Sequence, residues 1–221
     1  AMRALATPGQ RALCYAVPAI TDAQVLPNPQ PPEAVSTELS VEACRGEYEP
    51  ASFVVYAVGA PLSLECTATD LRGEKGIIPS SAVDLRSVKC WYQSGPPGRF
   101  PLNKGLRVLT AELLLKNDDL VRLDEENREN FVRLSFPDGS QKWLWVSSPE
   151  TTTEERDTSV EAMPIRDSAL LQPVYVPAET AKQMWVTVHV PSDAAAGDYE
   201  GEIRLATGGG EIGRMQLKVR V

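Results

Sequence analysis

Apolar and polar residues alternate with a period of two along most of this chain, the pattern of β-strands with one buried and one solvent-facing side. Clear cases are residues 62–68, 184–190, 199–205 and 215–221. Turn-forming glycines and prolines separate these segments at spacings typical of sandwich folds. The pattern predicts an all-β, antiparallel two-sheet β-sandwich of about ten strands with few short helices.

Two segments sharpen this prediction, and three others are less regular. Residues 52–58 form a continuous apolar run, as in a strand deep in a sandwich, and Pro137-Asp138-Gly139 links apolar runs on either side into a predicted hairpin. Residues 110–115 fit either a helical turn or a buried strand, residues 118–130 fit a short helix, and residues 149–173 predict a long polar surface segment. The 18 prolines and 15 glycines argue against long helices.

The length of 221 residues fits a single β-sandwich domain over residues 12–221, with residues 1–11 as an N-terminal lead. Ala1-Met2 looks like the remnant of an expression tag. The last strand pattern still alternates at Val221, so we expect a domain excised from a longer protein. The N-terminal residues lack the apolar core of a signal peptide, so either the protein is intracellular or its signal is absent here. The tag-like start favours the second alternative, a secreted or periplasmic protein.

The charge and the cysteines limit the partners. The net charge of -8 argues against nucleic acid as a partner, and no apolar run is long enough to predict a membrane span. Cys14, Cys44, Cys66 and Cys90 match no zinc pattern. Two disulfides are one alternative, but free cysteines acting as small apolar residues are favoured, with Cys66 and Cys90 buried. No metal or cofactor is expected.

Five motifs carry a resemblance to a known family. They are ACRGEYEPASF (43–53), VKCWYQ (88–93), ELLLKND (112–118), QMWVTVHVP (183–191) and AGDYEG (196–201). Together they resemble the N-terminal β-sandwich domain of large bacterial glycoside-hydrolase-like proteins. Physically these motifs fix the fold: Gly197 suits a turn with positive φ, Tyr199 points inward, and Gly201 permits close packing.

The resemblance implies that a (β/α)-barrel follows the sandwich and carries the catalytic carboxylates. No residue of this chain matches them, so the chain alone is not expected to be an enzyme. It is expected to be a non-catalytic accessory module that packs on the downstream catalytic barrel of a carbohydrate-active protein. The alternatives are an independent carbohydrate-binding module, or a structural or adhesion-type sandwich with a protein partner.

Aromatic residues supply the candidate contacts. Trp91 and Tyr92 end one predicted strand, and the glycine- and proline-rich loop after them carries Arg99 and Phe100. These four are candidates for the interface with the downstream domain or for glycan contact, and an inward-facing satellite core is a nearly equal alternative. Trp143 and Trp145 share one face of a hairpin strand and are weaker glycan candidates, with core packing as the default.

Two polar features have structural interpretations. His189, the only histidine, is expected to pack beside Trp185 in a strand rather than to act as a base. An acidic run is expected to be a solvated face, with calcium binding as the less favoured alternative. Its members are Asp118, Asp119, Asp124, Glu125, Glu126 and Glu129.

Overall fold

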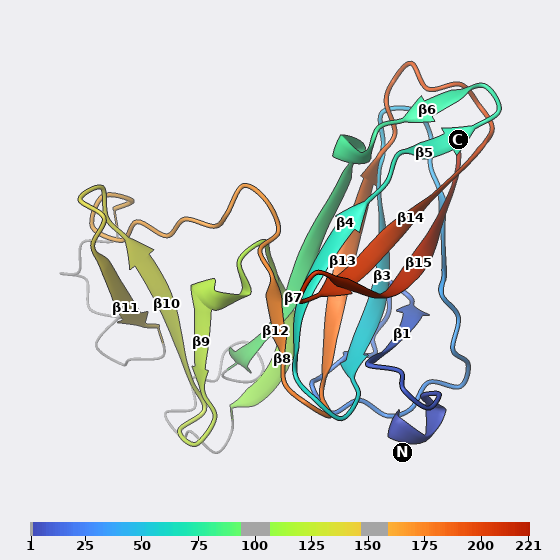
Figure 1. The fold of residues 1–221 in the computed structure, drawn as a ribbon. Coiled ribbons are helices and arrows are strands. Elements are labelled where there is room, and N and C mark those ends of the chain that lie inside the picture. Colours follow the sequence, from blue (N-terminus) through green and yellow to red (C-terminus); the bar gives the residue numbers. More distant parts are fainter. Residues whose placement is uncertain (1, 94–106, 147–158) are drawn as a thin grey trace.

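The computed structural model describes residues 2–93, 107–146 and 159–221, and in these ranges the chain is almost entirely β. Two sheets pack face to face, and a third, smaller sheet stands to one side of them (Figure 1). The predicted all-β sandwich is confirmed. None of the described helices is long and apolar enough to cross a membrane.

The first sheet of the sandwich is antiparallel throughout and has five strands. In spatial order they are β1 (Ala12–Val17), β3 (Tyr48–Ala57), β13 (Ala181–His189), β7 (Val83–Gln93) and β8 (Val108–Leu115). All but the last residue of the run 52–58 lies in β3, which pairs with β1 on one side and β13 on the other. Residues 110–115, for which a helical turn and a strand were both open, lie in β8.

The second sheet has seven strands. Its main order is β12 (Val174–Val176), β4 (Leu62–Ala68), β14 (Asp198–Thr207), β15 (Gly210–Arg220) and β2 (Glu38–Glu42), and β14 also pairs with β5 (Leu71–Gly73), which pairs with β6 (Gly76–Ile78). Strand β2 runs parallel to β15, a departure from the purely antiparallel prediction. The alternation of apolar and polar residues shows which face of a strand is buried. It does not show whether the neighbouring strand runs parallel or antiparallel.

The core lies between these two sheets and contains the apolar residues that the alternation assigned to it. Phe53 and Met184 of the first sheet and Ile203, Leu205 and Leu217 of the second are fully buried. On the other face of the first sheet, Met2 from the short 3-10 helix η1 (Met2–Leu5) packs in a second buried cluster with strands β1 and β3.

All four cysteines are free, the arrangement that their spacing favoured. Cys66 and Cys90 are each partly exposed to solvent, so the prediction that both would be buried overstated their burial. Burial raises the pKa of Cys14 to about 12 and also raises the pKa of Cys66. Both thiols therefore stay protonated and unreactive at neutral pH.

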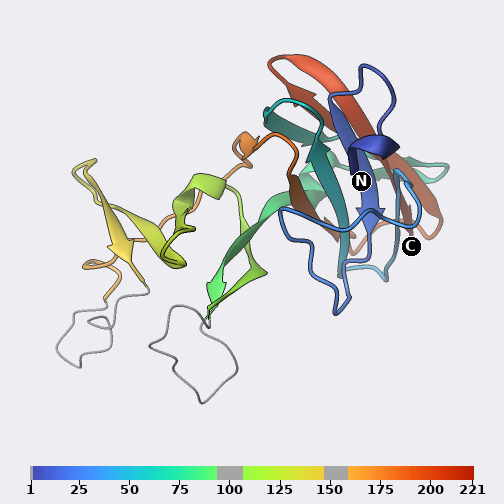
Figure 2. The ribbon, with the colours of Figure 1, turned by 90° about the horizontal axis from the view of Figure 1, so that it is seen from below.

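The third sheet has three strands, in the order β11 (Gln141–Trp145), β10 (Glu129–Ser135) and β9 (Val121–Asp124). The predicted hairpin about Pro137-Asp138-Gly139 joins β10 and β11. The helix expected within residues 118–130 is only the single 3-10 turn η4 (Asp118–Leu120), and β9 follows it directly. The view from below shows this sheet beyond the far ends of β7 and β8 (Figure 2).

The predicted roles of Gly197 in a turn and of Gly201 in close packing are both confirmed. Gly197 has a positive φ of 154° at the turn before β14, and Tyr199 then points inward, with only 2% of its surface exposed. A Cβ on Gly201 would lie 2.7 Å from Leu71 Cδ2 and 2.8 Å from Asp70 O, so only glycine allows the chain after β4 to approach β14 this closely.

This close approach predicts that Gly201→Ala destabilises the fold by about 1–3 kcal/mol, because the methyl group must displace backbone as well as a side chain. Gly210→Ala is the control, since its Cβ would have its nearest neighbour at 3.8 Å. Urea unfolding should show a change within about 0.5 kcal/mol for the control. Equal stability of the two variants would contradict the packing role of Gly201.

Candidate functional site

The aromatic pair at the end of β7 lies where the sandwich meets the three-stranded sheet. Trp91 is half-buried, and its Nε1 donates a hydrogen bond to Glu112 Oε2 at 2.5 Å. The backbone N–H of Tyr92 donates to Asn130 Oδ1 at 2.8 Å, and Asn130 Nδ2 donates to Tyr92 O at 2.8 Å. One buried amide side chain thus joins β7 to β10. Arg99 and Phe100 lie outside the described residues.

Asp118 holds the same joint together by charge. Its Oδ1 accepts hydrogen bonds from Lys182 Nζ at 2.8 Å and Ser87 Oγ at 3.0 Å, and its Oδ2 accepts one from Lys89 Nζ at 2.9 Å. Burial alone would raise the pKa of Asp118, but the two ammonium groups outweigh burial and hold this pKa below its usual range. The carboxylate is therefore ionised, and both of its oxygens accept hydrogen bonds.

This arrangement corrects the expectation of a solvated acidic face at Asp118, which is 8% exposed. Glu129 is also buried, whereas Asp119, Glu125 and Glu126 are exposed as predicted. In the described ranges, no three His, Cys, Asp or Glu residues are grouped to hold a metal ion.

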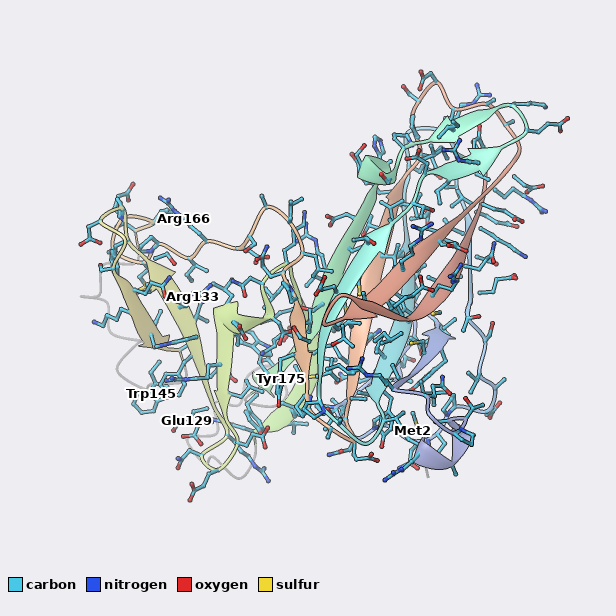
Figure 3. The ribbon with its side chains drawn as sticks, viewed as in Figure 1. Met2, Glu129, Arg133, Trp145, Arg166 and Tyr175 are labelled. Carbon is cyan, nitrogen blue, oxygen red and sulfur yellow. The ribbon has the colours of Figure 1, made fainter. Side chains whose placement is uncertain are left out.

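The face of the three-stranded sheet that carries Trp143 and Trp145 also carries Arg122 and Phe131. Phe131 lies opposite both Arg122 and Trp145 in the strand register. The guanidinium carbon of Arg122 lies 5.1 Å from the centroid of Phe131 and 4.7 Å from that of Trp143, the geometry of cation–π contacts. Trp145 is 36% exposed and lies on the side of the molecule away from Met2 (Figure 3).

We call Arg122, Phe131, Trp143 and Trp145 the aromatic–arginine face. The opposite side of the same sheet turns inward, where Val121 and Val132 pack with Leu115 and Leu120 in a small core. Trp143 and Trp145 are thus brought together as predicted, on the outer side of the sheet rather than in a core layer. Trp91 and Tyr92 belong to the five-stranded sheet, where Trp91 Nε1 bonds to Glu112 of β8 and the backbone N–H of Tyr92 bonds to Asn130 of β10.

His189 also has a different neighbour from the one expected. Its ring stacks on Tyr48, with centroids 4.2 Å apart and planes 10° apart, rather than beside Trp185. Tyr48 lies directly opposite His189 in the pairing of β3 with β13. Register across strands, which the sequence did not give, decides this contact.

Sequence analysis missed Arg122, Phe131 and the lysines that bind Asp118. Lys89 and Lys182 lie 93 positions apart in the chain, on neighbouring strands, so no local pattern links them. Arg122 and Phe131 carried a usable signal, because each alternates with an apolar residue that turns inward.

Comparison with known protein families identifies a large part of this chain. Residues 104–207 match the glycoside hydrolase 123 N-terminal domain. The resemblance to the N-terminal domain of glycoside-hydrolase-like proteins is thereby confirmed. The matched stretch contains β8, the three-stranded sheet with its aromatic–arginine face, β12, β13 and β14.

Solved structures give more distant similarity. A family 123 glycoside hydrolase from Clostridium perfringens, studied for glycolipid glycan hydrolysis, is 12% identical with a TM-score of 0.47, over 84% of this chain and 22% of that chain. AvmM, which catalyses macrocyclization in alchivemycin A biosynthesis, is 7% identical with a TM-score of 0.36, over 97% of this chain and 90% of that one. The chain spans about a fifth of the length of the glycoside hydrolase. No curated protein matches the chain.

The ion cluster at the joint predicts that Asp118→Asn destabilises the protein by about 3 kcal/mol or more, because two lysines lose their shared counter-ion in a buried site. Asp119→Asn, at the exposed neighbouring carboxylate, should change stability by less than about 0.5 kcal/mol. Denaturant unfolding at neutral pH measures both variants.

The same cluster predicts a dependence on pH. Because the pKa of Asp118 is lower in the folded than in the unfolded chain, its stabilisation is complete above the unfolded carboxyl pKa and is lost as pH falls through the folded value. The gap in stability between the wild type and Asp118→Asn should therefore narrow in acid. A constant gap down to the lowest pH at which the protein folds would contradict this assignment.

Proposed function

We propose that this chain is a non-catalytic accessory β-sandwich module of a secreted or periplasmic bacterial carbohydrate-active protein, and that it packs on a downstream catalytic barrel. The observation that carries the proposal is the aromatic–arginine face, which presents Arg122, Phe131, Trp143 and Trp145 on a small sheet that projects from the sandwich. The match to an N-terminal domain of glycoside hydrolases supports this role.

The composition of this face favours a protein partner over a sugar. Tryptophan, phenylalanine and arginine are enriched at the centres of protein interfaces. A pyranose that stacks on an aromatic residue needs an uncovered ring face, but Arg122 already covers one side of both Phe131 and Trp143. An arginine held over two rings is preorganised to pair with a carboxylate of a neighbouring domain.

Four carboxyl groups have properties that are consistent with a non-catalytic role. A glycosidase that uses two carboxyl groups needs one whose pKa is raised, so that it can donate a proton to the leaving group. Four carboxyl groups of the described residues, Asp84, Asp118, Asp138 and Glu179, have a pKa below the usual range. They are suited to ion pairs and hydrogen bonds rather than to acid catalysis.

The proposal predicts that Trp145→Ala weakens the contact between this module and the barrel. In the full-length protein, the double variant Trp145→Ala/Arg122→Ala should lower the Tm and speed proteolytic cleavage between the two domains, because a docked aromatic residue and the arginine of the same face are lost. In the isolated module the same double variant should lower the Tm clearly less, because only contacts within the small sheet are lost there.

Ile77→Ala is the matched control, because Ile77 is an exposed apolar residue on β6 of the other sheet. It should behave as the wild type in both contexts. Loss of stability in the isolated module equal to that in the full-length protein would show that the aromatic–arginine face is part of the fold and would overturn docking. Glycoside turnover by the purified module alone would overturn the non-catalytic role.

A further inference from the structure

A groove lies on the outer face of the five-stranded sheet, separate from the aromatic–arginine face. It has a volume of about 470 Å³ and is lined by β13, β7 and β8 on one side and by residues 19–24 on the other. This volume lies within the range of about 300–1,000 Å³ typical of small-molecule sites. Trp185 supplies its aromatic wall, and Val88 and Leu114 supply apolar surface beside it.

Three polar side chains in the groove each use one of their two terminal polar atoms in a hydrogen bond to the protein. Glu112 Oε2 accepts hydrogen bonds from Trp91 Nε1 and Gln93 Nε2. Gln24 Oε1 accepts one from the backbone N–H of Ala111 at 3.1 Å, which also ties the loop of residues 19–24 to β8. Gln183 Nε2 donates to the hydroxyl of Ser52 at 2.8 Å.

The second terminal polar atom of each of these side chains can form a hydrogen bond with a ligand. In the described part of the chain no hydrogen bond occupies Glu112 Oε1, Gln24 Nε2 or Gln183 Oε1. Two acceptors and one donor are thus held in place before any ligand arrives. Groups fixed in this way lose little conformational entropy on binding.

A β-bulge puts Glu112 in this position. Lys89 pairs with Leu113 and Cys90 pairs with Ala111, so Glu112 is the extra residue of β8 at the irregularity. Bulges redirect a side chain and are frequent beside binding sites. Here the bulge places the carboxylate within reach of both Trp91 and the groove.

The charge of the groove selects among ligands. Its charged lining residues are Asp22 and Glu112, both acidic, and no lysine or arginine lines it among the described residues. Arg86, which lies opposite Trp185 in the strand register, is paired with Asp84 at 2.6 Å. Phosphates and acidic sugars are therefore repelled, whereas hydroxyl groups, which donate to carboxylates, are attracted.

We infer that this groove binds a neutral glycan, with one pyranose ring stacked on Trp185 and its hydroxyl groups bonded to Glu112, Gln24 and Gln183. An aromatic ring faces the apolar side of a sugar, and the fixed acceptors and donor fit the hydroxyl groups at its edge. The inference does not depend on docking to a barrel, because every group that it uses belongs to the five-stranded sheet and the loop of residues 19–24.

The test is a titration of the module with lactose, cellobiose and diacetylchitobiose, followed by calorimetry and by tryptophan fluorescence. At least one of these should bind with a Kd between about 0.01 and 1 mM. Trp185→Ala should weaken that binding at least about tenfold. Tyr175→Ala, at an exposed aromatic residue on β12 of the other sheet, should leave it unchanged.

A second variant tests the site in case Trp185→Ala does not fold. Glu112→Gln keeps the shape of the side chain at an exposed position and should weaken the neutral glycan about threefold to tenfold, because a charged acceptor becomes a neutral one. It should also improve the binding of digalacturonate, which the wild type should bind at least about tenfold more weakly than the neutral sugars.

Three results would overturn the inference. They are no binding of any neutral probe up to about 10 mM, equal binding by the wild type and both groove variants, and binding of digalacturonate as tight as that of the neutral sugars. Because all are measured on the module alone, they are independent of the domain-docking experiment.

Discussion

The ionised carboxylate of Asp118 is the contact on which the arrangement of the two parts of this protein depends. It lies between Lys89 of β7 and Lys182 of β13, on the inward side of the five-stranded sheet just beyond the apolar core. Removal of three charges from water is unfavourable unless each is paired, so the position of the chain after β8 is tightly specified. The three-stranded sheet begins three residues later, at Val121, so the contacts of Asp118 also set where this sheet starts.

Neighbouring contacts reinforce the same joint. Lys116 forms an ion pair with Asp84 at 2.7 Å, and the carboxylate of Asp167 accepts the backbone N–H groups of Lys116 and Asn117 at 2.8 Å each. Asn130 adds its two bonds to Tyr92. In the described part of the chain this sheet has a core of four buried residues, which would be marginal by itself. The surrounding hydrogen bonds and ion pairs add to the stability of this small core.

The sequence predicted the parts of this fold that depend on local pattern. Residues 62–68 became β4 with the same bounds, and the turn at Pro137-Asp138-Gly139 joined the strands expected on either side. What it did not predict depends on contacts between distant segments. The parallel pairing of β2 with β15 and the ring of His189 on Tyr48 are set by register, and alternation contains no register.

For the candidate site residues, too, the sequence predicted what depends on local pattern and not what depends on contacts between distant segments. Trp143 and Trp145 were placed correctly on one face because side-chain direction along a strand follows from the pleat. That Arg122 covers Trp143 required knowledge of which strand lies next to β10. Trp185 was expected only as a neighbour of His189, and its place in the groove depends on a loop more than 160 positions away.

Strands β7 and β8 connect the two proposed surfaces. The same ribbon lines the groove with Val88, carries the bulge at Glu112, and ends at Trp91 and Tyr92, where Asn130 attaches the three-stranded sheet. Trp91 bonds to the carboxylate proposed to bind a hydroxyl group, and its neighbour Tyr92 bonds to the sheet proposed to dock a barrel. A shift of this ribbon would therefore move Glu112 and the aromatic–arginine face together. If both proposals hold, the joint at Asp118 would fix the direction in which the proposed glycan faces the proposed neighbouring domain.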